Sequence, residues 1–394
     1  MKKTLLLVLS LILSVGLLAG CGDKEKTTTE ADSGDTIKVG LNYELSGTVA
    51  TYGEDSVKGI ELAIEEINAA GGVDGKTIEL VKIDNKSEGS EATSVATKLV
   101  DQEGVVAILG PATSGNFKAT IPVGESKKVP VISASATADD VTTKDGKAYD
   151  YVFRTCFSDS YQGSVMATFA NEKLSATKAV IIKDTSSDYA KGLADNFQST
   201  FEDAGGQIVA SEGYVAGDTD FKSILTKIKG SEFDVIYLPG YYSEVGLIVK
   251  QARDLGIDVP VLGGDGYDSP TLLELAGAEA LNDVYFTNHY SAVDQDPKVV
   301  EFQKAFKDKY GADASAFNAT GYDLGKFIAD AIDRADSTDP AKIQEALAAT
   351  DGFVGVTGTI TVDELHNAVK SIVVIGLENG EQASAEKIGG AEAE

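Results

Sequence analysis

Side chains that could bind an anion follow two apolar, strand-like runs of this 394-residue sequence. The run VVAILG (105–110) leads into PATSGN, which places Thr113 and Ser114 at the start of a helical pattern. The run VPVISAS (129–135) leads into ATADD, which carries Ser135 and Thr137 near the strand end. Hydroxyls and free N–H groups at a helix N-terminus bind anions, carboxylates included. The pattern indicates a carboxylate site, and the alternative is that these hydroxyls only cap helices.

Groups suited to a cation follow three later strand-like runs. Tyr189 follows AVIIKD (179–184), Tyr241 and Tyr242 follow DVIYLPG (234–240), and Asp265 ends VPVLGGD (259–265). An acid can pair with an ammonium group, and a tyrosine ring adds cation–π attraction. The alternative is that the tyrosines pack at an edge and that Asp265 is a turn residue. An anion site and a cation site together would hold a zwitterion.

Most catalytic and metal-binding patterns are missing. The sequence has two histidines, His289 and His366, and neither lies in an HExxH motif or a Cys/His cluster. It has no GxSxG elbow and no GxxxxGK[ST] phosphate loop. Residues 84–95 lack the ligands of a calcium loop, since Lys86 and Val95 stand at ligand positions. We therefore expect no metal and no cofactor, although 62 acids leave simple acid–base chemistry open.

The elements that must position these groups alternate along the chain. Strand-like runs at 37–43 and 78–84 join those named above, with helical patterns at 53–70, 188–204 and 244–255 between them. In the first of these helices Val57, Ile60, Ile64 and Ile67 share one face. Such alternation predicts βαβ units and parallel sheets. The number of strands favours two α/β lobes, each a doubly wound parallel sheet. Ligands bind such sheets outside the carboxyl ends of the strands.

Charge and cysteine content limit the partners. The net charge is −28, and it becomes −30 if a segment holding Lys2 and Lys3 is removed. Nucleic acid would repel a protein this acidic, so we expect no nucleic-acid partner. Cys156 lies in YVFRTC, which reads as a buried strand, and we expect it to be a small core residue.

The first 35 residues have the pattern of an export signal and a tether. Lys2 and Lys3 precede residues 4–18, which are almost entirely apolar, and Ala19 and Gly20 lead into Cys21. The segment LAGC (18–21) resembles a bacterial lipoprotein lipobox, which implies cleavage after residue 20 and lipidation of Cys21. The alternative is an ordinary cleaved signal with a chance cysteine. Residues 22–35 have no apolar side chain larger than alanine, so we expect a disordered tether holding the protein to a membrane.

From about residue 36 to residue 380 the chain resembles the type I periplasmic solute-binding proteins of ABC importers, in their leucine/isoleucine/valine branch. The resemblance is carried by IKVGLNYELSGTVATYGEDSVKGIELAIEEINAAGGVDGKTIELVKID, ILGPATSG, VPVISASATADDVT, VFRTCFSDSYQG, DYAKGLADNF and YLPGYYSEVGLIVKQARDLG. It implies two α/β lobes, joined by three crossovers, that close on a ligand like a clamshell. The expected first lobe is 36–157 plus 288–368, the second is 158–287 plus 369–386, and 387–394 form a flexible tail.

The resemblance also implies site residues. The carboxylate contacts fall on Ser114, Thr137 and the backbone near Ser135, and the acid that receives the amino group falls on Asp265. The aromatic contacts fall on Tyr52, Tyr189, Tyr241 and Phe317. Some relatives have Glu at the position of Asp265, and some have a disulfide near ILGPATSG that this chain lacks. The shorter acid leaves the particular amino acid open.

Three functions compete at this point. The first is a lipid-anchored receptor, outside the cytoplasm on the cytoplasmic membrane of a bacterium, that delivers an amino acid to an ABC permease. The second is a sensory binding module that serves a signalling partner instead. The third is an extracellular α/β hydrolase or amidase, against which the missing nucleophile–histidine pair argues.

Overall fold

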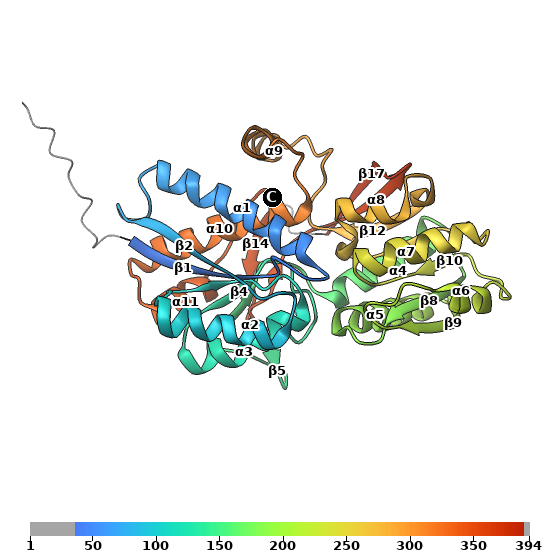
Figure 1. The fold of residues 1–394 in the computed structure, drawn as a ribbon, viewed down its shortest axis with the longest axis horizontal. Helices are drawn as coiled ribbons and strands as arrows, with labels where there is room; N and C mark the ends of the chain where they lie inside the picture. Colours follow the sequence, from blue (N-terminus) through green and yellow to red (C-terminus); the bar gives the residue numbers. More distant parts are fainter. Residues whose placement is uncertain (1–35, 390–394) are drawn as a thin grey trace, which may run out of the picture. The chain divides into compact units, whose positions relative to one another are not determined.

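The computed structural model describes residues 36–389. The predicted signal peptide (1–20), the predicted lipidation site Cys21 with its tether (21–35), and most of the predicted tail lie outside the described residues. The fold consists of two sheets with helices on their faces, seen on the two sides of Figure 1. No helix between residues 36 and 389 is both long and apolar enough to cross a membrane.

The first sheet has five parallel strands in the order β2-β1-β3-β4-β7. Four of the strand-like runs in the sequence form β1 to β4, and all of β1 except its first residue is buried or nearly so. The strands are β1 (Thr36–Tyr43), β2 (Thr77–Asp84), β3 (Ile108–Leu109), β4 (Val131–Ser133) and β7 (Val152–Arg154). The order reverses at β1, so β1 and β3 leave a crevice at their carboxyl ends. Cys156 lies just beyond β7 and is fully buried, as expected.

Two helix pairs cover this sheet, α1 with α10 and α2 with α3. They are α1 (Ala50–Ala69), α2 (Gly89–Lys98), α3 (Ser114–Lys127) and α10 (Ala316–Ala335). Helices α1 and α10 cross at glycines: a Cβ on Gly59 would lie 2.0 Å from the carbonyl oxygen of Asn318, and one on Gly321 would lie 2.2 Å from that of Ser56. This close crossing brings Phe317 against Tyr52, with ring centroids 4.4 Å apart.

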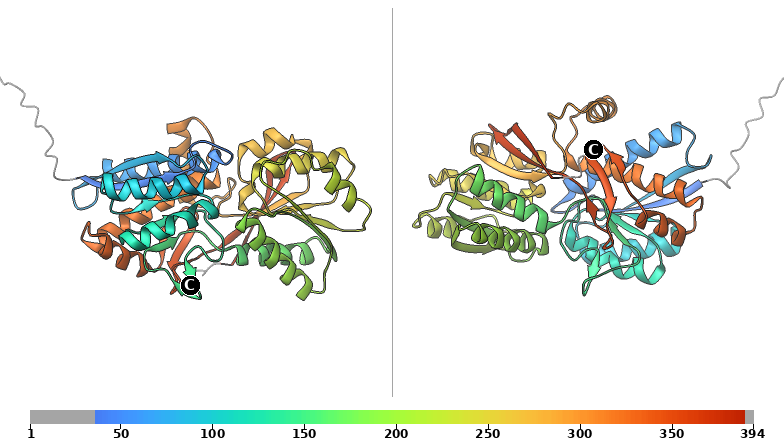
Figure 2. Two further views of the ribbon diagram at one scale, coloured as in Figure 1. Left: turned by 60° about the horizontal axis from the view of Figure 1, so that its bottom comes forward. Right: turned by 180° about the vertical axis from the view of Figure 1, so that it is seen from behind.

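The second sheet has seven strands in the order β17-β16-β12-β11-β10-β8-β9. They are β8 (Lys178–Asp184), β9 (Gln207–Tyr214), β10 (Val235–Tyr237), β11 (Val261–Gly263), β12 (Val284–Asn288), β16 (Ile372–Glu378) and β17 (Glu381–Ile388). Its helices are α4 (Asp159–Glu172), α5 (Asp188–Asp203), α6 (Lys222–Ile228), α7 (Tyr242–Asp254) and α8 (Pro270–Ala276). Figure 2 shows the last two strands, in red, beside the yellow and green elements.

The predicted parallel sheets are confirmed except at one edge of the second sheet, where β16 pairs antiparallel with β12 and with β17. The turn between β16 and β17 is Asn379-Gly380, and both residues have positive φ angles (51° and 77°). An Asn-Gly pair in this conformation forms a tight hairpin, which forces neighbouring strands to run in opposite directions. β17 also continues to Ile388 by pairing with Ile372, so residues 387 and 388 belong to a strand and not to a flexible tail.

The chain passes between the two sheets three times. It leaves the first sheet between β7 and α4, returns after β12, and passes back between β15 and β16. The middle passage leads to α9 (Pro297–Tyr310), α10 and α11 (Pro340–Ala348), and then to a small sheet of β13 (Phe353–Gly355), β14 (Gly358–Val362) and β15 (Ala368–Val369). Asn288 pairs with Val373 inside the second sheet, so the predicted lobe boundary at 288 falls one residue early. We call the two sheets with their helices the first and second lobes.

Candidate ligand-binding site

A small cavity lies between the two lobes, at the carboxyl ends of strands from both sheets. Its volume is about 10 Å³. The first lobe contributes Tyr52, Ala112, Thr113, Ser114, Ser135 and Phe317, and the second contributes Tyr189, Tyr241, Asp265 and Gly266. Seven of the eight predicted site residues therefore meet at one place.

The first lobe presents hydroxyls and backbone around the loop that joins β3 to α3. Ser135 donates its hydroxyl hydrogen to the carbonyl oxygen of Ala112 (2.9 Å), and the Ser114 hydroxyl accepts from the amide N–H of Ala138 (3.1 Å). Ser114 is the first residue of α3, whose N-terminus carries a partial positive charge. These bonds hold two loops in place around a helix start that favours an anion.

Glu44 was missed by the sequence analysis, although it is fully buried beside this loop. Its carboxylate accepts from the amide N–H groups of Ala112 (2.9 Å) and Thr113 (3.1 Å), from the Thr113 hydroxyl (2.9 Å) and from Asn116 Nδ2 (2.9 Å). Part of the predicted anion cradle is thus filled by the chain's own carboxylate. The available signal was its place directly after the run IKVGLNY, at the carboxyl end of β1.

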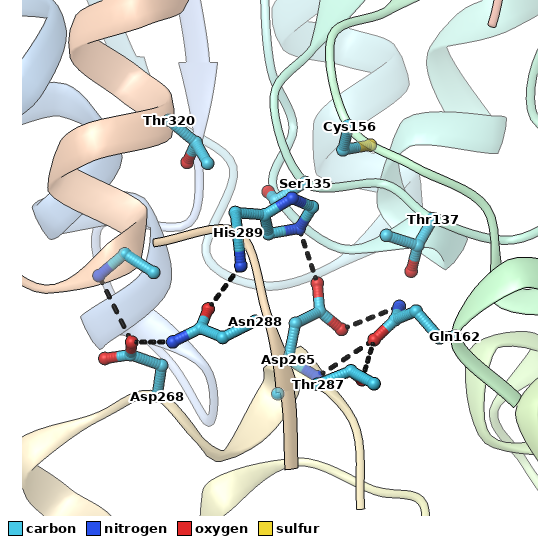
Figure 3. A network of polar contacts seen from close by, with 12 residues as sticks. Ser135, Thr137, Cys156, Gln162, Asp265, Asp268, Thr287, Asn288, His289 and Thr320 are labelled. Carbon is cyan, nitrogen blue, oxygen red and sulfur yellow. Dashed lines mark hydrogen bonds and ion pairs between the residues drawn. The ribbon is translucent and has the colours of Figure 1, made fainter. Parts of the chain in front are cut away.

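The second lobe presents a buried acid. Asp265 begins a short 3₁₀ turn after β11 and is 3% exposed. Its Oδ1 accepts from the Tyr189 hydroxyl (2.8 Å) and from Gln162 Nε2 (3.1 Å), and its Oδ2 lies 3.2 Å from His289 Nε2. Figure 3 shows Gln162 and His289 on either side of this carboxylate. Neither residue was predicted, and no local motif marks them.

Aromatic rings form the walls of the cavity. Tyr189 and Tyr241 stack with centroids 5.1 Å apart and planes 5° apart, and Tyr52 meets Tyr241 edge to face at 5.6 Å. Phe317 lies against the other side of Tyr52. Burial raises the pKa of Tyr52 and Tyr189 well above the ordinary value, so both phenols stay protonated and can donate.

Thr137 is the one predicted site residue that does not line the cavity. Its carbonyl oxygen accepts from Arg154 Nη1 (2.8 Å) and from the amide N–H of Asp159 (2.8 Å), and its buried hydroxyl has no hydrogen-bond partner in the described part of the chain. Asp159 is also fully buried, and burial raises its pKa well above the ordinary value. Thr137 thus joins the end of the first lobe to the start of α4.

The arrangement can hold a small molecule with a negative and a positive end. Hydroxyls and a helix start face the cavity from one lobe, and a buried carboxylate faces it from the other, with aromatic rings between them. Two lining hydroxyls already donate hydrogen bonds within the protein, Thr113 to Glu44 and Ser135 to the carbonyl oxygen of Ala112. None of the ten lining residues is a histidine. The chemistry of these lining groups is suited to a zwitterion with an apolar side chain.

Fold and site together define a two-lobed protein that binds a small molecule between its lobes. The family model described as "Periplasmic binding protein" matches residues 36–382, and the chain belongs to this family. As a member, it is a substrate-binding protein that works outside the cytoplasm.

Individual relatives agree with this assignment. The chain is 34% identical over 330 residues to a leucine-, isoleucine-, valine-, threonine- and alanine-binding protein of Pseudomonas aeruginosa, covering 84% of this chain and 86% of the relative. It is similar in structure to the branched-chain amino acid transporter substrate binding protein LivJ of Streptococcus pneumoniae, solved with isoleucine (45% identity, TM-score 0.85, 90% and 99% of the two chains). It is also similar to the leucine binding protein LivK of Thermotoga maritima (37% identity, TM-score 0.83, 90% and 98% of the two chains).

Proposed function

We propose that this protein captures a branched-chain or other aliphatic amino acid between its lobes and delivers it to an ABC permease. The observation that carries the proposal is the buried carboxylate of Asp265 facing the hydroxyls of Ser114 and Ser135 across one aromatic-walled cavity. The likeness to a solved isoleucine complex supports the same ligand class.

The two ends of the amino acid bind to different lobes. Its carboxylate is bound by Ser114 and the backbone near Ser135, at the start of α3; Thr137, which does not line the cavity, is left out of this contact. Its ammonium group pairs with Asp265, under the rings of Tyr189 and Tyr241. Each hydrogen bond to a charged group contributes about 1.5–3 kcal/mol, so a ligand that contacts both lobes favours the closed arrangement.

The lobes must separate for the ligand to enter. A cavity of about 10 Å³ has roughly the space that one water molecule needs, which is far less than an amino acid occupies. Entry therefore needs a hinge motion about the three crossovers, followed by closure. The protein performs no chemistry on the ligand; the closed, liganded form is the one that the permease receives.

The N-terminal segment belongs to the same proposal. A lipid on Cys21 would hold the protein on the outer face of the cytoplasmic membrane, close to the permease. A Cys21→Ala variant is then expected in the soluble fraction, and the parent protein in the membrane fraction. A parent protein that stays soluble would contradict the anchor without affecting the ligand site.

A thermal-shift screen tests the ligand. The protein is unfolded and refolded to remove any ligand that was carried through purification, and is then heated with each of the twenty amino acids. A rise in melting temperature of several degrees with isoleucine, leucine or valine supports the proposal, because a ligand that binds the folded state stabilises it. No shift with any amino acid would contradict it.

A further inference from the structure

The carboxylate of Asp265 also contacts two side chains outside the cavity lining. Gln162 on α4 and His289 after β12 are both absent from the cavity lining, yet each contacts one oxygen of this carboxylate. Gln162 is fully buried, and His289 is 4% exposed.

Gln162 is fixed in one orientation by four hydrogen bonds, one of them a long bond from its Nε2 to Asp159 Oδ1 (3.4 Å). Its Oε1 accepts from the amide N–H of Asp265 (3.2 Å) and from the Thr287 hydroxyl (2.6 Å). Because two donors define the amide oxygen, the amide nitrogen must point the other way, and there it donates to Asp265 Oδ1 (3.1 Å). Gln162 therefore hydrogen-bonds both the backbone and the side chain of Asp265 (Figure 3).

His289 is fixed by its ring. It stacks on Phe157 with centroids 3.7 Å apart and planes 12° apart. Burial lowers the pKa of His289 to about 4, so the ring is neutral near pH 7. Since an ionised carboxylate only accepts, the neutral ring must carry its hydrogen on Nε2 to bond Asp265 Oδ2. Phe157 belongs to the first crossover and His289 to the second, so the stack joins the two.

We propose that Gln162 and His289 are positioning residues for the ammonium site. By bonding one oxygen each, they stop the Asp265 side chain from rotating. Oδ1 already accepts from Tyr189 and Gln162, so the second lone pair of Oδ2 is left for the ligand. A carboxylate held in this way needs no rearrangement when the ligand's ammonium group arrives. This inference rests on the proposed function, because it takes Asp265 as the acceptor of that group.

The two histidines of the sequence provide a matched test. His366 also stacks on a phenylalanine, Phe153 (4.1 Å, 16°), but its Nδ1 lies near the carbonyl oxygen of Val152 and not near Asp265. His289→Met removes the donor and keeps an apolar side chain of similar length. We expect isoleucine to bind it about 10- to 100-fold more weakly, the worth of one hydrogen bond to a charged group. His289→Gln, which can place an amide nitrogen near the position of Nε2, should recover most of the affinity, and His366→Met should bind like the parent.

A second variant guards against a folding defect. Gln162→Met removes all four bonds of the amide and should weaken isoleucine binding by a similar factor. In a double-mutant cycle, adding His289→Met to Asp265→Asn should cost little further affinity, because the held group is already changed. Fully additive losses, or variants that bind like the parent, would overturn the positioning role.

A spectroscopic measurement reports the contact without any ligand. Nitrogen NMR of the two imidazoles, assigned with His366→Met, should show His289 as the Nε2–H tautomer near pH 7, with a changed signal in Asp265→Asn. A parent protein that binds no amino acid would contradict the proposed function, and the positioning role would fail with it. If the parent protein binds an amino acid but the His289 signal is the same in the parent and in Asp265→Asn, only the positioning role is contradicted.

Discussion

The hydroxyl of Tyr52 donates a hydrogen bond to the backbone carbonyl oxygen of Gly266, 214 positions further along the chain. Tyr52 lies at the start of α1 in the first lobe, and Gly266 follows Asp265 in the second. The same hydroxyl accepts from the amide N–H of Tyr242 at 3.3 Å. One phenol thus links the lobes directly beside the cavity, and separation of the lobes must break both bonds.

Tyr52→Phe should weaken ligand binding while leaving the ring contacts intact. The variant loses the bonds that favour the closed arrangement, and a neutral hydrogen bond contributes about 0.5–1.5 kcal/mol. We expect a loss of about 2- to 15-fold in isoleucine affinity, measured by calorimetry. Tyr310→Phe is the control, because the Tyr310 hydroxyl bonds the carbonyl oxygen of Lys58 within the first lobe. Equal effects of the two variants would show that closure does not depend on Tyr52.

Glu44→Gln should lower both stability and affinity. The carboxylate accepts four bonds at the start of α3, and an amide can accept only part of that set. We expect a loss of about 1–3 kcal/mol in the free energy of unfolding by urea. Ligand binding should also weaken, since the loop carries Ser114. Glu244→Gln is the comparison: this buried carboxylate accepts from the amide N–H of Gly217, away from the cavity. A Glu44 variant as stable as the parent would contradict this reading.

Lys118 forms an ion pair across the lobes that should be sensitive to salt. Its Nζ lies 3.0 Å from Asp188 Oδ2 at the start of α5 and 2.6 Å from Asp140 Oδ1. Partly exposed pairs are worth about 0.2–1 kcal/mol, so Lys118→Gln should weaken binding by up to about fivefold at low salt. The difference should vanish near 1 M salt, where such charges are screened. Lys191→Gln removes a pair with Asp188 inside the second lobe and should leave affinity unchanged; a salt-independent loss in Lys118→Gln would refute the ion-pair explanation.

Asp268→Asn should change how stability depends on pH. Burial, with Asp55 and Asp265 nearby, raises the pKa of Asp268 from 3.8 to about 6. Between these values the folded state holds a proton that the unfolded state has released, so raising the pH through this window lowers the stability of the parent. Asparagine can still accept from Asn288 and from the amide N–H of Ala316. Between pH 4 and pH 7 the free energy of unfolding of the variant, measured with urea, should rise relative to that of the parent by on the order of 1–3 kcal/mol. If the free energies of unfolding of the two proteins changed with pH in parallel, this would contradict the raised pKa of Asp268.

Much of the fold was predictable because its signals are local. The runs that became β1, β2 and β8 are apolar, and the helix that became α1 has its apolar residues on one face. The antiparallel pair β16 and β17 was missed, although Asn379-Gly380 is a hairpin signal, because the alternation of strands and helices earlier in the chain suggested only parallel sheets.

The site residues also include some that the sequence indicates and some that it does not. Ser114, Ser135 and Asp265 follow strands, so the sequence marks them, and Tyr52 and Phe317 came only from the family resemblance. Gln162 carries no such mark, since Asp265 lies 103 positions away and is brought to it only by the packing of the chain. Glu44 also follows a strand, but its partners lie 68–72 positions away, so its position did not reveal its role.

The central claim is that Asp265 binds the ammonium group of an amino acid, and calorimetric titration of isoleucine into Asp265→Asn tests it most directly. Asp184→Asn is the matched control, a buried acid at the end of β8 that accepts from Ser186 and does not line the cavity. We predict that the Asp265 variant binds at least about 100-fold more weakly than the parent, because the ammonium group loses its charged partner in a buried site, and that the control binds like the parent. An Asp265 variant that binds isoleucine as tightly as the parent would contradict the account.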